Sequence, residues 1–169
     1  VLRGRFASMV LVIAPILGFW QVYMLEVGSL STMTLFGYEI LGVEVDKQAK
    51  VFGYLFHLAA LVAGIYSFHL RDPWQISMAL LYAASAVGVA FAGDMISLFL
   101  WWEGLAITSV FQIWGRKTKE AEESGFRYLF FHVSSGLLLL AGILFRYHGE
   151  GDSALSLEPL TEALEAGDP

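Results

Sequence analysis

Apolar residues along this chain fall into five long runs separated by polar connections. As a helix with a rise of 1.5 Å per residue, a run of about 20 residues extends about 30 Å, which is the thickness of the hydrocarbon core of a bilayer. The first and third runs contain no Asp, Glu, Lys or Arg. The pattern predicts an all-α integral membrane protein with five transmembrane helices. These helices are expected at residues 6–25, 51–70, 73–93, 95–115 and 126–145.

The connection between the first two runs is too long for a tight turn. Residues 26–50 contain two β-prone stretches, 33–36 and 40–45, which Gly37 and Tyr38 separate. Short alternating stretches on either side of a turn are typical of a hairpin. We therefore expect a short β-hairpin on the extracytoplasmic surface.

The third and fourth runs are separated by very few residues. Only Asp94, with Gly93 before it, stands between them, so the two helices should form a tight antiparallel pair. Ala84, Gly88 and Ala92 recur every four residues in the third run. Such a stripe of small residues allows a neighbouring helix to approach closely.

Composition excludes several classes of function. The chain of 169 residues is 57% hydrophobic and 15% charged, whereas about a quarter of the residues of a soluble domain are charged, so a soluble enzyme is excluded. The absence of Cys excludes disulfides, thiolate metal sites, iron–sulfur clusters and c-type haem. A net charge of −6 without a dense basic block argues against nucleic-acid binding.

Basic residues are unevenly divided between the two sides that five crossings define. Seven lie on the side of the N-terminus and three on the other side, and residues 149–169 carry six acids and no base. By the positive-inside rule, the N-terminus is cytoplasmic and residues 149–169 form an acidic extracytoplasmic tail. We expect a multi-pass protein of the cell (inner) membrane. The seven are Arg3, Arg5, Arg71, Arg116, Lys117, Lys119 and Arg127; the three are Lys47, Lys50 and Arg146.

Glu103 is the charged residue that cannot be placed at a helix end or in a connection. Counted along the fourth run, it lies about 12 Å from Met95 and about 18 Å from Gly115, close to the bilayer midplane. A charge at that depth costs about 3 kcal/mol or more, so such a residue is expected to be functional. We expect Glu103 to carry protons. The alternative is a structural Glu that pairs with a base on another helix.

Two histidines lie within the expected spans. His132 is about 9 Å from the cytoplasmic end of the last run and shares a helix face with Gly136, so it is a candidate proton relay to Glu103. The alternative is a histidine that bonds a neighbouring backbone carbonyl. His57 lies at a similar depth from the opposite side and is a second relay candidate. His69 and His148 lie at helix ends and are expected to be solvated.

Two further charged residues have competing interpretations. Arg127, one residue inside the last run, either extends to the cytoplasmic headgroups or is a charge partner of an intramembrane carboxylate. Asp94 precedes Met95 and is expected to cap the fourth helix, with ion entry as the alternative. We expect neither a metal nor a cofactor. A b-type haem bound by His57 and His132 is disfavoured because the two residues lie at different depths.

The run from Asp94 to Ser109, DMISLFLWWEGLAITS, resembles a helix of the proton-conducting antiporter-like membrane subunits. Respiratory complex I, membrane-bound hydrogenases and Mrp-type cation/proton antiporters share these subunits. The resemblance covers residues 30–147 and implies that Glu103 is the intramembrane proton-handling Glu of the family's Trp-Glu motif. Supporting matches are Val45-Asp46, Phe52, Tyr66-Ser67, Arg127-Tyr128 and Ser134-Ser135-Gly136.

The chain departs from that family at one residue and in length. The family often has Lys where Arg127 stands, and this chain resembles only the second to sixth helices. The seventh helix of the family, with a central Lys that pairs with the Glu, has no counterpart here. Residues 1–148 are therefore expected to be part of a larger antiporter-like fold, in a natural subunit or a fragment of one.

These features favour a component of a membrane complex that moves protons, alone or in exchange for Na⁺, through Glu103. The alternative is a membrane scaffold subunit that transports nothing. The expected partners are the lipid bilayer and other membrane subunits of the complex, including one that supplies the missing buried Lys. Enzymatic activity is expected only as part of a redox-driven proton-pumping complex.

Overall fold

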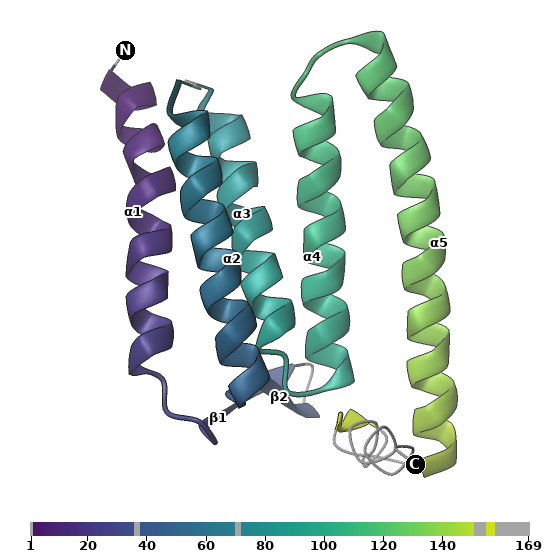
Figure 1. The fold of residues 1–169 in the computed structure, drawn as a ribbon. Helices are drawn as coiled ribbons and strands as arrows, with labels where there is room; N and C mark the ends of the chain where they lie inside the picture. Colours follow the sequence, from purple (N-terminus) through teal and green to yellow (C-terminus); the bar gives the residue numbers. More distant parts are fainter. Residues whose placement is uncertain (1, 36–37, 70–71, 151–154, 158–169) are drawn as a thin grey trace, which may run out of the picture.

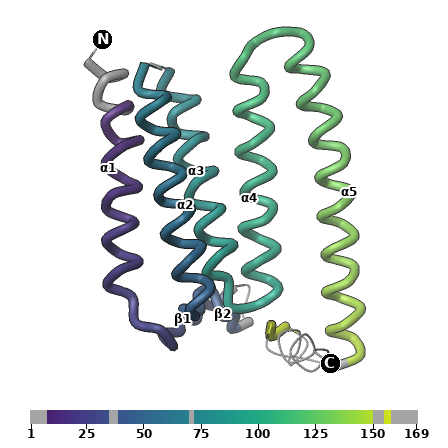
Figure 2. Tube along the Cα trace, in the orientation of Figure 1, coloured from purple at the N-terminus to yellow at the C-terminus, as the bar shows by residue number. Residues whose placement is uncertain are grey.

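The computed structural model describes residues 2–35, 38–69, 72–150 and 155–157, and it contains five α-helices and one β-hairpin in those ranges (Figure 1). α1, α2 and α3 pack against one another, α4 packs on α3, and α5 packs on α4 at the edge of the bundle (Figure 2). The predicted class, an all-α membrane protein with a short hairpin, is confirmed. The helices are α1 (Leu2–Met24), α2 (Lys47–Tyr66), α3 (Pro73–Ala90), α4 (Met95–Trp114) and α5 (Lys119–Glu150); a 3₁₀ turn, η1 (Ser67–His69), follows α2.

Four of the helical segments are long and apolar enough to cross a membrane. They are Lys47–His69, Pro73–Ala90, Met95–Trp114 and Lys119–Gly149. α1 contributes the shorter apolar stretch Ser8–Met24, within the first predicted span. The chain is therefore a multi-pass membrane protein.

Aspartates set the starts of three helices. Asp46, Asp72 and Asp94 precede α2, α3 and α4, and each side-chain carboxylate accepts a hydrogen bond from a backbone N–H of the first turn. This places the start of α2 four residues before the predicted span, because capping rather than hydropathy fixes the helix end. The N-cap expected at Asp94 is confirmed. The three donors are Ala49, Trp74 and Ser97.

The hairpin predicted between the first two helices is confirmed. β1 (Leu30–Leu35) pairs antiparallel with β2 (Tyr38–Glu44). Its second strand is tied to the α3–α4 turn, because the Leu41 N–H donates to Oδ2 of Asp94 at 2.6 Å and the Glu44 N–H donates to the carbonyl of Phe91 at 2.9 Å. The hairpin therefore closes one end of the bundle.

A small apolar cluster lies under the hairpin. Val22, Val45, Ala49 and Phe91 are buried together, and Val45 is 1% exposed. Between Val22 and Val45 the chain turns at Gly28, whose φ of +92° is a left-handed conformation that favours glycine. The cluster joins α1, α2 and the end of α3 beneath the hairpin.

α3 and α4 form the tight antiparallel pair that their short connection predicts. The Trp101 side chain of α4 covers Gly88, and a Cβ at Gly104 would lie 2.8 Å from Oγ of Ser85. Gly88 belongs to the predicted stripe of small residues, and its contact with Trp101 shows how that stripe is used. The connection itself spans residues 91–94, because α3 ends at Ala90 rather than at the predicted residue 93.

The tail predicted at residues 149–169 lies mostly outside the described residues. Of the part that is described, Ser156 forms an isolated antiparallel bridge with Asp94. This contact places residues 155–157 at the same end of the bundle as the hairpin.

Candidate functional site

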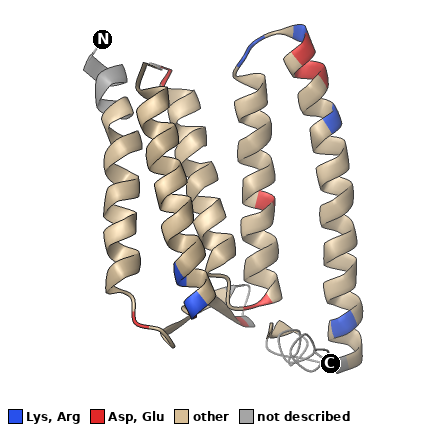
Figure 3. Cartoon of the chain, in the orientation of Figure 1, with Lys and Arg blue, Asp and Glu red and all other residues tan. Residues whose placement is uncertain are grey.

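Glu103 lies midway along α4, and the other charged positions in α4 and its neighbours are concentrated near helix ends and in connections (Figure 3). Its carboxyl faces α5. A Cβ at Gly136 would overlap Oε1 of Glu103 and would lie 3.1 Å from its Cδ. Gly136 is itself buried. The carboxyl group thus occupies space that exists only because residue 136 has no side chain.

The carboxyl of Glu103 has an unsatisfied oxygen. Oε1 is buried and has no hydrogen-bond partner among the residues that the structure describes. A buried polar atom without a hydrogen-bond partner is costly and uncommon in a folded protein, so this oxygen calls for a functional explanation.

His132 lies one helical turn before Gly136, on the same face of α5. Its ring stacks with Trp102 of α4, with centroids 5.8 Å apart, and with Tyr128 of α5, with centroids 5.6 Å apart. Nε2 of His132 is buried and, within the described ranges, has no hydrogen-bond partner. The interface between α4 and α5 therefore holds two titratable side chains that each have an unsatisfied polar atom.

His57 has a different environment. Its Nδ1 lies 2.7 Å from the carbonyl oxygen of Gly53, one turn earlier on α2, and its ring covers Gly18 of α1. His57 therefore packs between α1 and α2, whereas His132 packs between α4 and α5. The structure does not bring these two histidines into one site, and the haem interpretation has no geometric support.

Arg127 lies nine residues before Gly136 on α5, about 13 Å away along the helix axis. Its side chain is exposed and makes no ion pair with a described acid. The role of Arg127 as a charge partner of Glu103 remains a prediction, because the described residues show no ion pair between them. The same ranges contain no group of three His, Cys, Asp or Glu side chains arranged to hold a metal ion.

Sequence reasoning missed the residues that surround the two titratable groups. The sequence places Gly136 on the same helix face as His132, but it does not show that Gly136 contacts Glu103 or that Trp102 and Tyr128 stack with His132. The available signal was the spacing of Tyr128, His132 and Gly136, which recur every four residues and so lie in one row on α5.

Residues 92–168 match a family model described as NADH:quinone oxidoreductase/Mrp antiporter, transmembrane. The matched region contains α4 with Glu103 and α5 with His132. This part of the chain is therefore similar to the antiporter-like family. No curated protein matches the sequence.

A solved structure shares the fold of this chain. It is a chain of the membrane-bound sulfane sulfur reductase, an archaeal respiratory membrane complex, with a TM-score of 0.69 and 20% sequence identity. The similarity covers 89% of this chain and 36% of the solved chain. The present chain therefore spans about a third of the length of that relative.

Proposed function

We propose that this chain is part of the membrane portion of a respiratory-type complex and that Glu103 carries protons within it. The observation that carries the proposal is the buried Oε1 of Glu103, which lacks a hydrogen-bond partner among the described residues. The match of residues 92–168 to the antiporter-like family and the similarity to a chain of a respiratory membrane complex support it. The transported ion is H⁺, alone or in exchange for Na⁺.

The chemistry follows from the cost of charge in the membrane. Protonated Glu103 is neutral and can remain buried, whereas the carboxylate needs a nearby cation. We assign that cation to a Lys outside this chain, from further sequence or from a partner subunit. Proton transfer onto or off Glu103 then makes or breaks this pairing and drives the next transfer.

His132 is the candidate relay from the cytoplasmic side. An imidazole can accept a proton on one ring nitrogen and release one from the other, and Nε2 of His132 lacks a hydrogen-bond partner within the described ranges. The stacking of Trp102 and Tyr128 against the ring limits its rotation. A ring held in this way presents the same nitrogen to each arriving proton.

The first test replaces Glu103 in the intact complex. We expect Glu103→Gln to abolish substrate-driven acidification in inside-out vesicles, because an amide cannot bind a transferable proton, and Glu103→Asp to retain part of the rate. Glu120→Gln is the matched control, because Glu120 lies in the exposed first turn of α5. Wild-type transport by the Glu103→Gln variant would overturn the proposal.

The second test compares the two histidines. His132→Gln should slow proton transport by about tenfold or more, in the range of a lost acid–base group. His57→Gln should leave the rate close to wild type, because His57 bonds its own helix and packs against α1. Equal effects of both substitutions on the transport rate would contradict a relay role for His132.

A scaffold without transport is the second candidate, with Glu103 as a residue that pairs with a base on another helix. In that case Glu103→Gln would lower the amount of assembled complex, while the activity per assembled complex would stay unchanged. Measuring both quantities on the same membranes separates the two functions.

A further inference from the structure

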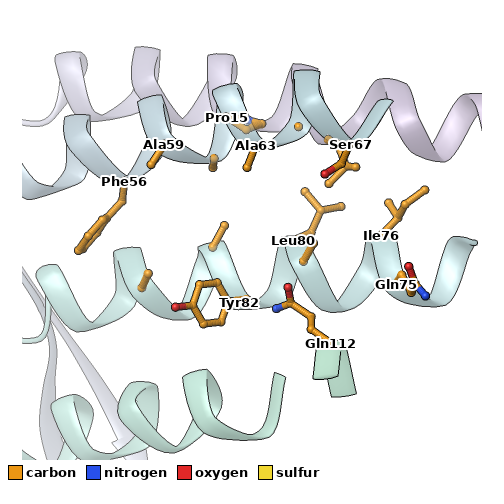
Figure 4. Close-up of a pocket in the computed structure, with 16 residues that line it drawn as sticks. Pro15, Phe56, Ala59, Ala63, Ser67, Gln75, Ile76, Leu80, Tyr82 and Gln112 are labelled. Carbon is orange, nitrogen blue, oxygen red and sulfur yellow. The ribbon is translucent and has the colours of Figure 1, made fainter. Parts of the chain in front are cut away.

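A cavity of about 390 Å³ lies between α1, α2 and α3, on the other side of the bundle from the α4–α5 interface (Figure 4). Most of its wall is apolar and built from small side chains, among them Ala59, Ala63 and Ala83. None of the residues assigned to proton handling lines it. The cavity is therefore a separate feature of the fold.

Polar side chains gather at one end of this cavity. Ser67 follows the last residue of α2, Gln75 is in the first turn of α3, and Gln112 is in the last turn of α4, so all three lie at the end opposite the hairpin (Figure 4). Nε2 of Gln75 donates to the carbonyl oxygen of Gly115 at 2.7 Å, which holds the end of α4 against this site. In the part of the chain that the structure describes, the Ser67 hydroxyl and the Gln112 amide make no hydrogen bond.

The cavity has the depth of one bilayer leaflet. Its lining residues extend along α2 from Ser67 to Phe56, and along α3 from Gln75 to Ala86. Either distance is about 16 Å at the rise of an α-helix, or about half of the 30 Å hydrocarbon core. The polar end therefore lies at the level of the headgroups, and the apolar end lies near the midplane.

The lining of the cavity suits a hydrocarbon chain. It is apolar along about 16 Å of α2 and α3, and small side chains on both helices leave the space between them open.

Two cationic residues follow the polar end of the cavity along the chain. Arg116 and Lys117 directly follow Gly115, the residue that Gln75 bonds, and Nζ of Lys117 lies 3.9 Å from the carboxylate of Asp72 at the start of α3. Arg116 and Lys117 are both exposed. Their charge complements the phosphate of a lipid whose chain enters the cavity.

We propose that this cavity binds one chain of a bilayer phospholipid from the leaflet at the end opposite the hairpin. The chain lies along Leu80 and Ala83 toward Phe56, the polar linkage to the headgroup lies at Gln112 and Ser67, and the phosphate lies at Arg116 and Lys117. This site is independent of the proton-handling role of Glu103.

The test uses the full complex in vesicles that contain phosphatidylglycerol with a photoactivatable diazirine on one chain. Crosslinked residues are mapped by mass spectrometry, and the outer face of α5 is the internal control, because Leu138 and Phe145 are 75% and 84% exposed. We expect crosslinks at Leu80 and Ala83. After mixing with excess unlabelled vesicles, these crosslinks should decay about tenfold more slowly than those on α5, because a bound lipid dissociates slowly.

Two cavity variants and one control variant test whether the slow exchange depends on the cavity. Ala83→Leu fills the cavity and Gln112→Leu removes its polar end, so each should abolish the slow phase, whereas Leu138→Phe should leave it unchanged. Retained proton transport shows that each variant is folded. The proposal fails if α5 is labelled and the cavity is not, if both sites exchange at the same rate, or if Ala83→Leu keeps the slow phase.

Discussion

Glu103 fits against α5 because residue 136 is a glycine. The carboxyl fills the position that a Cβ at Gly136 would take, and its Oε1 has no hydrogen-bond partner in the described ranges. The acid itself is evident from sequence, since its distance from both ends of the fourth apolar run places it at the midplane. Its neighbour on α5 is not, because α5 is apolar on most of its circumference and hydropathy does not indicate which face meets α4.

A methyl group at residue 136 should therefore disturb proton transport. We expect Gly136→Ala to lower the transport rate about tenfold or more, because the added Cβ displaces the Glu103 carboxyl, and a misplacement of about 1 Å can cost up to about a hundredfold in rate. Substrate-driven acidification in inside-out vesicles measures the effect.

Gly142→Ala is the matched control for this substitution. A Cβ at Gly142, on the same helix, would meet no atom within 4 Å, so this variant should transport at the wild-type rate. Normal transport by Gly136→Ala would show that the carboxyl does not need its observed position.

At the scale of the elements, Asp94 connects the start of α4 to the hairpin. Oδ1 accepts from the Ser97 N–H and Oδ2 from the Leu41 N–H, each at 2.6 Å, and Asp94 is 5% exposed. The existence of the hairpin and the cap followed from local patterns, namely β-prone stretches around a turn and an Asp before an apolar run. The bond to Leu41 joins residues 53 positions apart, and no local pattern contains it.

Loss of the Asp94 carboxylate should destabilise the bundle more than loss of an ordinary cap. We expect Asp94→Ala to cost about 2–4 kcal/mol, from the lost cap and from a Leu41 N–H left without its partner. Asp72→Ala should cost about 1 kcal/mol, because Asp72 caps α3 from an exposed position.

Thermal unfolding of the two purified variants gives this comparison. A transition temperature that falls equally in both variants would mean that the contact between the hairpin and α4 contributes little. Equal stability of Asp94→Ala and wild type would contradict the assigned role.

At the scale of the whole molecule, large apolar side chains cover the outside of the bundle. On α5 alone, Phe130, Phe131 and Phe145 are 69%, 71% and 84% exposed. Their medium is lipid or further helices, and the solved relative is almost three times as long as the matched part of this chain. Helix count and membrane class were predictable because hydropathy measures them directly, but hydropathy does not show what covers the exposed face of α5.

The direction of insertion is open to a direct test because the chain has no cysteine of its own. Seven bases on the side of the N-terminus against three on the other predict that the loop before α5 is cytoplasmic and that the hairpin is outside. A membrane-impermeant maleimide should label Glu39→Cys on intact cells, and Glu120→Cys only after lysis. The reverse pattern would invert the proposed topology.

α5 is long enough to connect the Glu103 contact near the midplane with the water outside the membrane. Its 32 residues extend about 48 Å, well beyond a hydrocarbon core of about 30 Å, and contain no proline that would interrupt the helix. Because His132 and Gly136 lie on this single rod, a shift along its axis moves both past Glu103 at once. A shift of about 1.5 Å, the rise of one residue, is enough to withdraw Gly136 from the carboxyl. A soluble domain that bound the first turns of α5 and displaced this helix would therefore alter the contact between Gly136 and Glu103 near the midplane.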